Sequence, residues 1–192
     1  DAPVLLNLMN ELRKTGKEDM LFTYTSTSKI TFPGGGLAAL GASKNNIELI
    51  KNQMSAQTIG PNKINQLRHI RYFKNLEGVK AHMKLHAALL RPRFAAVLEE
   101  LDTIRDLGIA EWTEPKGGYF VSVDLTDGCA KRTIQLLKDA GVKMTPAGAT
   151  FPYGIDPRDR NIRIAPSYPP VEELRTAMKM FCLCAKIAAS EK

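Results

Sequence analysis

The stretch FTYTSTSKITFPGGG, residues 22–36, decides how the remainder of this chain is interpreted. It opens within an apolar segment, residues 20–24, that predicts a β-strand. Hydroxyl side chains then surround Lys29, and Pro33 followed by three consecutive glycines predicts a tight turn. Because ligands bind at the ends of strands in α/β sheets, Lys29 stands where a binding site is expected.

The chemistry of this stretch narrows the kind of ligand. Hydroxyl groups and glycine N–H groups hydrogen-bond a phosphate, and a desolvated lysine amine forms a Schiff base with an aldehyde. Pyridoxal phosphate (PLP) carries both groups, so this combination of residues is what a PLP site around Lys29 would require. The glycines match neither the GxGxxG nor the Walker nucleotide pattern. A polar loop with a solvated lysine is the alternative that stays open.

The first part of the chain alternates between helix and strand. Helical spacing of apolar residues predicts helices over residues 3–15 and 45–57, the second capped by Ser43. A short buried strand is predicted over residues 37–42, and two or more helices over residues 63–107. This alternation is typical of an α/β fold.

The later residues predict a small α+β domain. Strands are expected over residues 110–114, 119–125, 142–145 and 161–165. A helix is expected over residues 131–140, and a closing helix over residues 171–187 that Pro169 and Pro170 open. A boundary near Val79 divides the chain into residues 1–78 and residues 79–192.

Composition and charge are those of an ordinary soluble protein. The chain has 192 residues, 44% hydrophobic and 24% charged. No apolar run could span a bilayer and no secretory signal is present, so we expect a cytoplasmic protein with no membrane partner. The net charge of +7 comes from scattered basic residues interleaved with acidic ones, which favours a solvated surface over a nucleic-acid partner.

Cysteines and histidines offer only weak signals. Three cysteines argue against a disulfide framework, so we expect reduced, partly buried thiols at Cys129, Cys182 and Cys184. His82 and His86 lie four residues apart, a spacing that can hold a metal, with His69 as a conceivable third ligand. No carboxylate accompanies them, so we interpret them as solvated histidines on a helix face and predict no metal site.

Several motifs share their order and approximate spacing with one enzyme family. They are STSK with its Pro-Gly turn, PKGGYF, AGV, TPAG and NIRIA. With them the chain resembles the fold-type I, class I/II PLP-dependent aminotransferases. STSKITFPG, TIGPNKINQLRH and TPAGATFPYGIDPRDRNIRIAP look like the MocR-like group, whose characterised members are similar to aspartate aminotransferases. The resemblance covers essentially the whole chain, but only the C-terminal half of such an enzyme.

The resemblance implies the fold and the roles of four residues. The fold is the PLP-dependent transferase fold (fold type I): the end of the large α/β domain followed by a small α+β C-terminal domain. Lys29 would form the Schiff base with PLP and move the Cα proton, Ser26 and Ser28 would help to bind the cofactor, and Arg163 would bind the substrate α-carboxylate. The implied activity moves an amino group between an amino acid, L-aspartate, and a 2-oxo acid, 2-oxoglutarate, in a homodimer.

The chain departs from the family pattern in two places. Many class I enzymes bind the cofactor phosphate with an arginine seven or eight residues after the lysine, where Gly36 and Leu37 stand here. Glycine N–H groups and hydroxyls are the candidates to replace it. The arginine that reads a side-chain carboxylate also has no counterpart near residues 55–60, and Lys63, Arg68 or an upstream residue could replace it.

The first residues and the family label leave further readings open. Asp1-Ala-Pro-Val is not a natural initiation, so we expect a piece of a longer protein that is inactive by itself. The MocR label also covers transcription regulators, in which an aminotransferase-like effector domain follows a DNA-binding domain. A PLP β-lyase or decarboxylase on the same fold would share the cofactor chemistry.

Three further segments are interpreted, two of them in two ways. The resemblance implies that residues 62–69 approach the active site of a neighbouring subunit in a dimer, and the alternative is a capped surface helix. Trp112, Tyr119 and Phe120 are interpreted as core of the small domain. Residues 153–160 form an exposed charged loop or a mobile rim over the substrate.

Overall fold

The computed structural model describes residues 5–192. These residues form two compact units, and the division between the units falls within one long helix. The first unit ends at Ala87 and the second runs from Ala88 to Lys192. Helix α4 (Leu76–Asp102) contains the division. The predicted boundary near Val79 lies in the same helix and stays a prediction.

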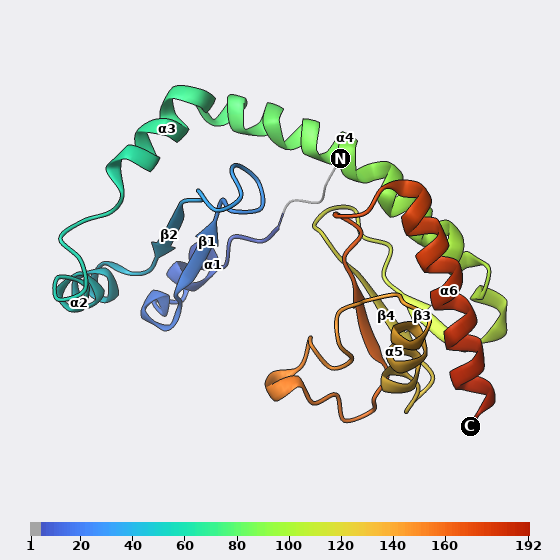
Figure 1. Ribbon diagram of the computed structural model, residues 1–192. Helices are drawn as coiled ribbons and strands as arrows, with labels where there is room; N and C mark the ends of the chain where they lie inside the picture. Colours follow the sequence, from blue (N-terminus) through green and yellow to red (C-terminus); the bar gives the residue numbers. More distant parts are fainter. Residues whose placement is uncertain (1–4) are drawn as a thin grey trace. The chain divides into compact units, whose positions relative to one another are not determined.

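The first unit contains a two-stranded antiparallel sheet (Figure 1). Strand β1 (Thr23–Ser26) pairs with β2 (Ala38–Gly41). The prediction of a buried strand over residues 37–42 is wrong in its burial, since only Leu40 of β2 is partly buried. Within residues 5–192 the two strands pair only with each other, and their side chains are largely exposed.

Helices of the first unit begin at residues whose side chains satisfy backbone N–H groups. Asn7, Ser43 and Asn62 each accept a hydrogen bond from the backbone N–H three residues later, and the predicted cap at Ser43 is confirmed. The predicted helix over residues 3–15 is shorter than expected, and its first two residues lie outside the described part of the chain. The helices are α1 (Leu8–Lys14), α2 (Lys44–Met54) and α3 (Lys63–Phe73), with the short 3₁₀ helix η1 (Glu18–Met20) after α1.

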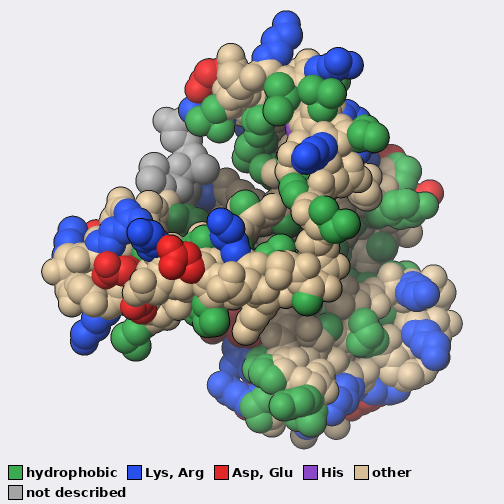
Figure 2. All heavy atoms as spheres, turned by 90° about the vertical axis from the view of Figure 1, so that its left-hand side faces the viewer, with side chains coloured by type: hydrophobic (Ala, Val, Ile, Leu, Met, Phe, Trp, Pro, Cys, Tyr) green, Lys and Arg blue, Asp and Glu red, His purple; other side chains and the backbone are tan. Residues whose placement is uncertain are grey.

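Apolar side chains of the first unit are exposed. Hydrophobic atoms lie at the surface in Figure 2, among lysines and arginines that are spread over the visible face. Contiguous exposed apolar surface marks places where other protein binds. The exposed set on α3 and just before it comprises Ile59, Ile64, Leu67, Ile70 and Tyr72.

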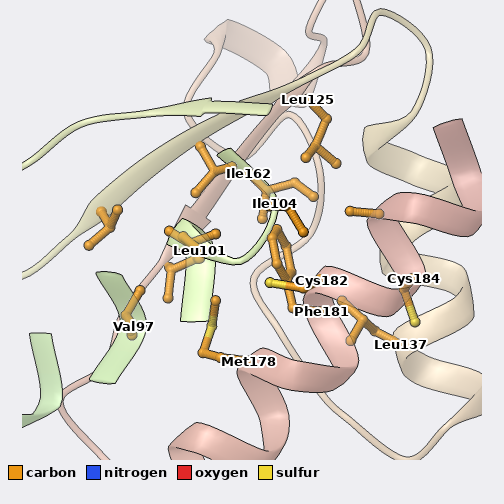
Figure 3. Packing of buried hydrophobic residues seen from close by; sticks show 14 of the residues in the cluster. Val97, Leu101, Ile104, Leu125, Leu137, Ile162, Met178, Phe181, Cys182 and Cys184 are labelled. Carbon is orange, nitrogen blue, oxygen red and sulfur yellow. The ribbon is translucent and has the colours of Figure 1, made fainter. Parts of the chain in front are cut away.

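The second unit is a three-stranded antiparallel sheet packed against helices (Figure 3). Alternate residues of β4 are buried, as expected for a sheet with one face on the core. Val97 and Leu101 of α4 and Phe181 of α6 pack against that face and are fully buried. The strands, in order, are β3 (Ala110–Trp112), β4 (Val121–Leu125) and β5 (Asn161–Ile164), and the following helices are α5 (Ala130–Asp139) and α6 (Val171–Ser190).

Most predicted elements of this unit are confirmed, and one is wrong. Residues 142–145 form no strand. Gly141 adopts a left-handed conformation after α5, and the N–H of Val142 donates to the carbonyl of Leu137 over 2.8 Å. These bonds finish the helix, and the chain then continues half-buried without a strand partner. Two short 3₁₀ helices, η2 (Arg105–Leu107) and η3 (Pro152–Gly154), complete the unit.

The cysteines are free and buried, as predicted. The thiol of Cys182 donates to the carbonyl of Glu100 over 3.3 Å, and that of Cys129 donates to the carbonyl of Ala188 over 3.5 Å. Cys184 also belongs to the hydrophobic core. Among the helices of the described residues, none combines the length and the apolar character that crossing a bilayer requires.

Burial makes Cys182 unreactive in the folded protein. Desolvation raises the pKa of its thiol to about 11, so on the order of 0.1% is thiolate at pH 8. Because the thiolate is the reacting form, we expect iodoacetamide to modify Cys182 at least about 100-fold more slowly in the native than in the unfolded protein. Peptide mass mapping of the alkylated site measures this, and equal rates in the two states would contradict the burial.

Candidate functional site

The loop between β1 and β2, residues 27–37, is called the lysine loop. Thr27 closes its base: the N–H of Thr27 donates to the Leu37 carbonyl over 2.7 Å, and the Thr27 hydroxyl accepts from the Leu37 N–H over 2.7 Å. The Thr27 carbonyl also accepts from the N–H groups of Ile30 and Thr31, at 2.9 and 2.8 Å. Lys29 therefore lies within a hydrogen-bonded turn, and its side chain is exposed.

Two serine hydroxyls lie next to this turn. The Oγ atoms of Ser26 and Ser28 are 2.9 Å apart, and the N–H of Ser28 donates to Ser26 Oγ over 3.2 Å. Gly36 lies against Ser28, since a Cβ at this glycine would come within 2.8 Å of the Ser28 backbone nitrogen. A larger residue would displace the serine, which accounts for glycine at this position. The predicted cofactor residues Ser26, Ser28 and Lys29 thus share one exposed segment, and their roles stay predictions.

Helix α3 binds the lysine loop through residues that the sequence did not assign. Asn65 donates from Nδ2 to the carbonyls of Gly35 and Gly36, at 2.8 and 3.2 Å. His69 is buried, and its Nε2 lies 3.0 Å from the hydroxyl oxygen of Thr31. Residues 62–69 form a capped helix, and their approach to a neighbouring subunit stays a prediction. The four-residue spacing of Asn65 and His69, which places both on one helix face, is the signal that could have paired them.

The prediction of solvated histidines is wrong at His69, which is only 7% exposed, and holds only in part at His82 and His86, which are both half-buried. The ring centroid of His82 lies 5.2 Å from that of Phe73. The rings of His69 and His82 belong to an aromatic cluster around Phe32 of the lysine loop, which packs between α3 and the start of α4. These contacts account for the burial of the two rings. Within residues 5–192, no group of three or more His, Cys, Asp or Glu side chains could hold a metal ion.

Arg163 lies on β5 in the second unit, whereas Lys29 belongs to the first. It stands opposite Ser122 of β4, and its Cζ lies 4.4 Å from the ring centroid of Phe120. Its Nε is buried and has no hydrogen-bond partner in the described part of the chain. A guanidinium held on an aromatic ring is suited to a carboxylate ligand, which its terminal N–H groups can bind.

Phe120 corrects the prediction that it belongs to the core. Its side chain is 43% exposed and covers the Arg163 guanidinium instead. The strand register explains the difference, since β4 begins at the next residue, Val121, which is buried on the other face. Trp112 is half-buried and packs against the core as predicted.

The loop before β5 is fixed by buried polar groups. The Asp156 carboxylate accepts hydrogen bonds from the backbone N–H groups of Arg158, Arg160 and Asn161. Burial opposes the charge on Asp156, but these donors outweigh it and lower the pKa of the carboxyl. The Asn161 side chain donates to Ser122 Oγ over 2.9 Å, which ties the loop to the strand opposite Arg163. These contacts favour a fixed loop over a mobile rim at residues 153–160, but Asp156 is buried and not exposed as that interpretation expected.

The sequence matches aminotransferases along its whole length. The family model for Aspartate amino-transferase matches residues 1–192. A curated protein of Mycolicibacterium smegmatis, whose name includes the word aminotransferase, is 48% identical over 177 residues, which are 92% of this chain and 41% of that protein. The aspartate aminotransferase of Corynebacterium glutamicum is 43% identical over 192 residues, which are 100% of this chain and 44% of the relative.

Solved structures match the fold. An aspartate transaminase of Corynebacterium glutamicum is similar with a TM-score of 0.95 and 43% identity, over 100% of this chain and 45% of that chain. LysN, an α-aminoadipate aminotransferase of Thermus thermophilus, was solved with N-(5'-phosphopyridoxyl)-L-leucine. It is similar with a TM-score of 0.77 and 20% identity, over 100% of this chain and 48% of that chain, which shows the fold alone. This chain spans less than half the length of these relatives.

Proposed function

We propose, because this chain belongs to the aspartate aminotransferase family, that the complete protein is a PLP-dependent aminotransferase. This chain has the fold of fold-type I PLP-dependent aminotransferases, as predicted. Since the chain spans less than half of its relatives, the activity is proposed for the complete protein. The observation that carries the proposal is the exposed turn that presents Lys29 beside two serine hydroxyls.

The residues of the lysine loop fit PLP. Lys29 lies exposed on the turn, a lysine amine forms a Schiff base with an aldehyde, and the hydroxyls of Ser26 and Ser28 are exposed donors for a phosphate. These two serines are the phosphate ligands that we propose from this chain, where Gly36 and Leu37 stand in place of the family's arginine. When bound, PLP supplies an electron sink for the bond that is broken at the substrate Cα.

The proposed roles of Lys29 and Arg163 differ: Arg163 binds the amino acid, and Lys29 moves its proton. Arg163 would bind the α-carboxylate with two parallel N–H donors, which fixes the orientation of the Cα–H bond. The Lys29 amine would take the Cα proton as a general base and then return it as a general acid. Neither step requires another titratable side chain of this chain.

L-Aspartate and 2-oxoglutarate are the substrates that we propose. The support is the Corynebacterium glutamicum relative, which is named an aspartate aminotransferase and is 43% identical over this whole chain. A homodimer and a cytoplasmic location stay predictions. The exposed apolar side chains of α3 support a partner surface in the complete protein, because single domains seldom leave such groups unpaired.

The complete protein with added PLP tests this function. We expect a visible absorbance band that borohydride removes, and peptide mapping should find the reduced adduct on Lys29. Aspartate should be consumed only when 2-oxoglutarate is supplied. Pyruvate and ammonia released without an acceptor would favour a β-lyase, and an adduct on another lysine would refute the role of Lys29.

Replacing Phe120 tests the carboxylate site at low structural cost. The ring stacks on Arg163 and is partly exposed, so Phe120→Leu should loosen the guanidinium without opening the core. A cation–π contact of this kind contributes a modest free energy, so we expect the KM for aspartate to rise about two- to fivefold. Steady-state kinetics measure this. Tyr168→Leu, at a position that is 94% exposed, is the control and should leave KM unchanged.

A further inference from the structure

We propose that Thr31 and His69 form a positioning pair that fixes Lys29 for proton transfer, an inference that rests on the proposed function. Lys29 lies midway between Thr27 and Thr31, and the backbone of the turn joins these two threonines through an N–H to carbonyl bond of 2.8 Å. The Thr31 hydroxyl then connects the turn to the buried ring of His69. The contact between Thr31 and His69, two residues from Lys29, therefore fixes the backbone position from which the Lys29 side chain extends.

The geometry at His69 assigns the hydrogens of this contact. Its Nδ1 lies 2.9 Å from the backbone carbonyl of Asn65, which can only accept, so Nδ1 carries a hydrogen. In the neutral ring Nε2 is then an acceptor, and the Thr31 hydroxyl donates to it over 3.0 Å. The helix backbone thus orients the ring, and the ring orients the threonine.

The Thr31 hydroxyl has other acceptors nearby. It lies 3.0 Å from the carbonyl oxygen and 3.0 Å from the hydroxyl oxygen of Thr27. The hydroxyl has a single hydrogen, so these acceptors compete for it with His69 Nε2. If the histidine is removed, the hydroxyl can turn to Thr27, so no buried donor is stranded and the protein is expected to fold.

Two further contacts hold the same part of the loop to α3. Phe32, next to Thr31, packs its ring 5.0 Å from His69 and 5.3 Å from Phe73, measured between ring centroids. Asn65 binds the carbonyls of Gly35 and Gly36. The loop is therefore fixed on the α3 side, while Lys29 stays exposed on the turn that precedes it.

Loosening this hold should affect the chemistry more than the binding of substrate. A small displacement of a reacting group can cost up to about 100-fold in rate, although the residue that moves it touches no substrate. In the complete protein with PLP, we expect Thr31→Val and His69→Leu each to lower kcat about tenfold, with the KM for aspartate changed by less than about twofold. The pH midpoint of the visible PLP band should shift in both variants, because the environment of the Lys29 nitrogen changes.

A double-mutant cycle separates a shared contact from two independent ones. If both residues act through one hydrogen bond, the double variant should be no slower than the slower single variant. His69→Gln should restore most of kcat, since its amide oxygen can accept from Thr31. His86→Leu is the matched control, because His86 lies on α4 and has a ring contact with His82 but none with the lysine loop.

The outcomes are distinguishable. Suppose that the wild-type protein shows the visible PLP band and the adduct on Lys29, while Thr31→Val and His69→Leu keep the wild-type kcat and the wild-type pH midpoint of the band. The positioning inference is then refuted, and the proposed function stands. Single effects that multiply fully in the double variant would also overturn it. If the wild-type protein shows no band, both fall. If His69→Leu does not fold, Thr31→Val decides alone, since valine keeps the shape of threonine and leaves α3 untouched.

Discussion

Replacing Lys29 with alanine in the complete protein should abolish the visible band of bound PLP and reduce amino transfer by about 10⁴-fold. The reason is that one amine is proposed to serve both as the covalent attachment and as the acid–base group at Cα. The exposed turn offers nothing to replace it, since the neighbouring Ser26 and Ser28 hydroxyls cannot form an imine. Absorbance spectra with added PLP and steady-state transfer from aspartate to 2-oxoglutarate measure the two effects.

Two matched variants test whether the effect comes from the amine of Lys29, from its positive charge, or from the loss of any lysine. Lys29→Arg keeps a cation, but a guanidinium stays protonated and neither forms the adduct nor accepts the proton, so the same loss is expected. Lys51→Ala removes an exposed lysine of α2 and should change neither the spectrum nor kcat. Wild-type spectra and turnover in Lys29→Ala would refute the assignment of the catalytic lysine.

The sequence predicts those parts of the fold that depend on local patterns. The cap at Ser43, the strand β4 and the proline-opened helix α6 were all predicted, because propensity and periodicity act within one element. The strand predicted over residues 142–145 was wrong because that prediction also used only local patterns. They have a strand-like composition, but a strand exists only where another strand pairs with it, and pairing is not a local property.

The sequence could propose the lysine loop as a site for a similar reason, since Lys29 and its serines are neighbours in sequence, and that assignment stays a prediction. The support from α3 was not predicted, because Thr31 and His69 are 38 residues apart and only the fold brings them together. The prediction that Phe120 is buried in the core was wrong for a different reason. Its aromatic side chain predicts burial, and a shift of one residue along the strand places it on the polar face against Arg163.

Arg163→Met should weaken the use of every α-amino acid while leaving the cofactor in place. Methionine keeps an unbranched side chain that can lie on Phe120, but it removes both donors proposed to bind the α-carboxylate. Truncating one partner of a desolvated charge pair is costly, so we expect kcat/KM for aspartate to fall about 100- to 1,000-fold. The visible PLP band should be unchanged, because Arg163 has no proposed contact with the cofactor.

The pattern across substrates distinguishes the two carboxylates of aspartate. If Arg163 binds the α-carboxylate, then aspartate and alanine should lose the same factor in kcat/KM, whereas a side-chain role would spare alanine. Arg163→Lys should lose less than Arg163→Met, since it keeps the charge but not the fork of two N–H groups. Arg132→Met, at an exposed arginine of α5 that pairs with Glu191, is the control and should behave as wild type. Loss of the PLP band in Arg163→Met would instead assign this arginine to the cofactor.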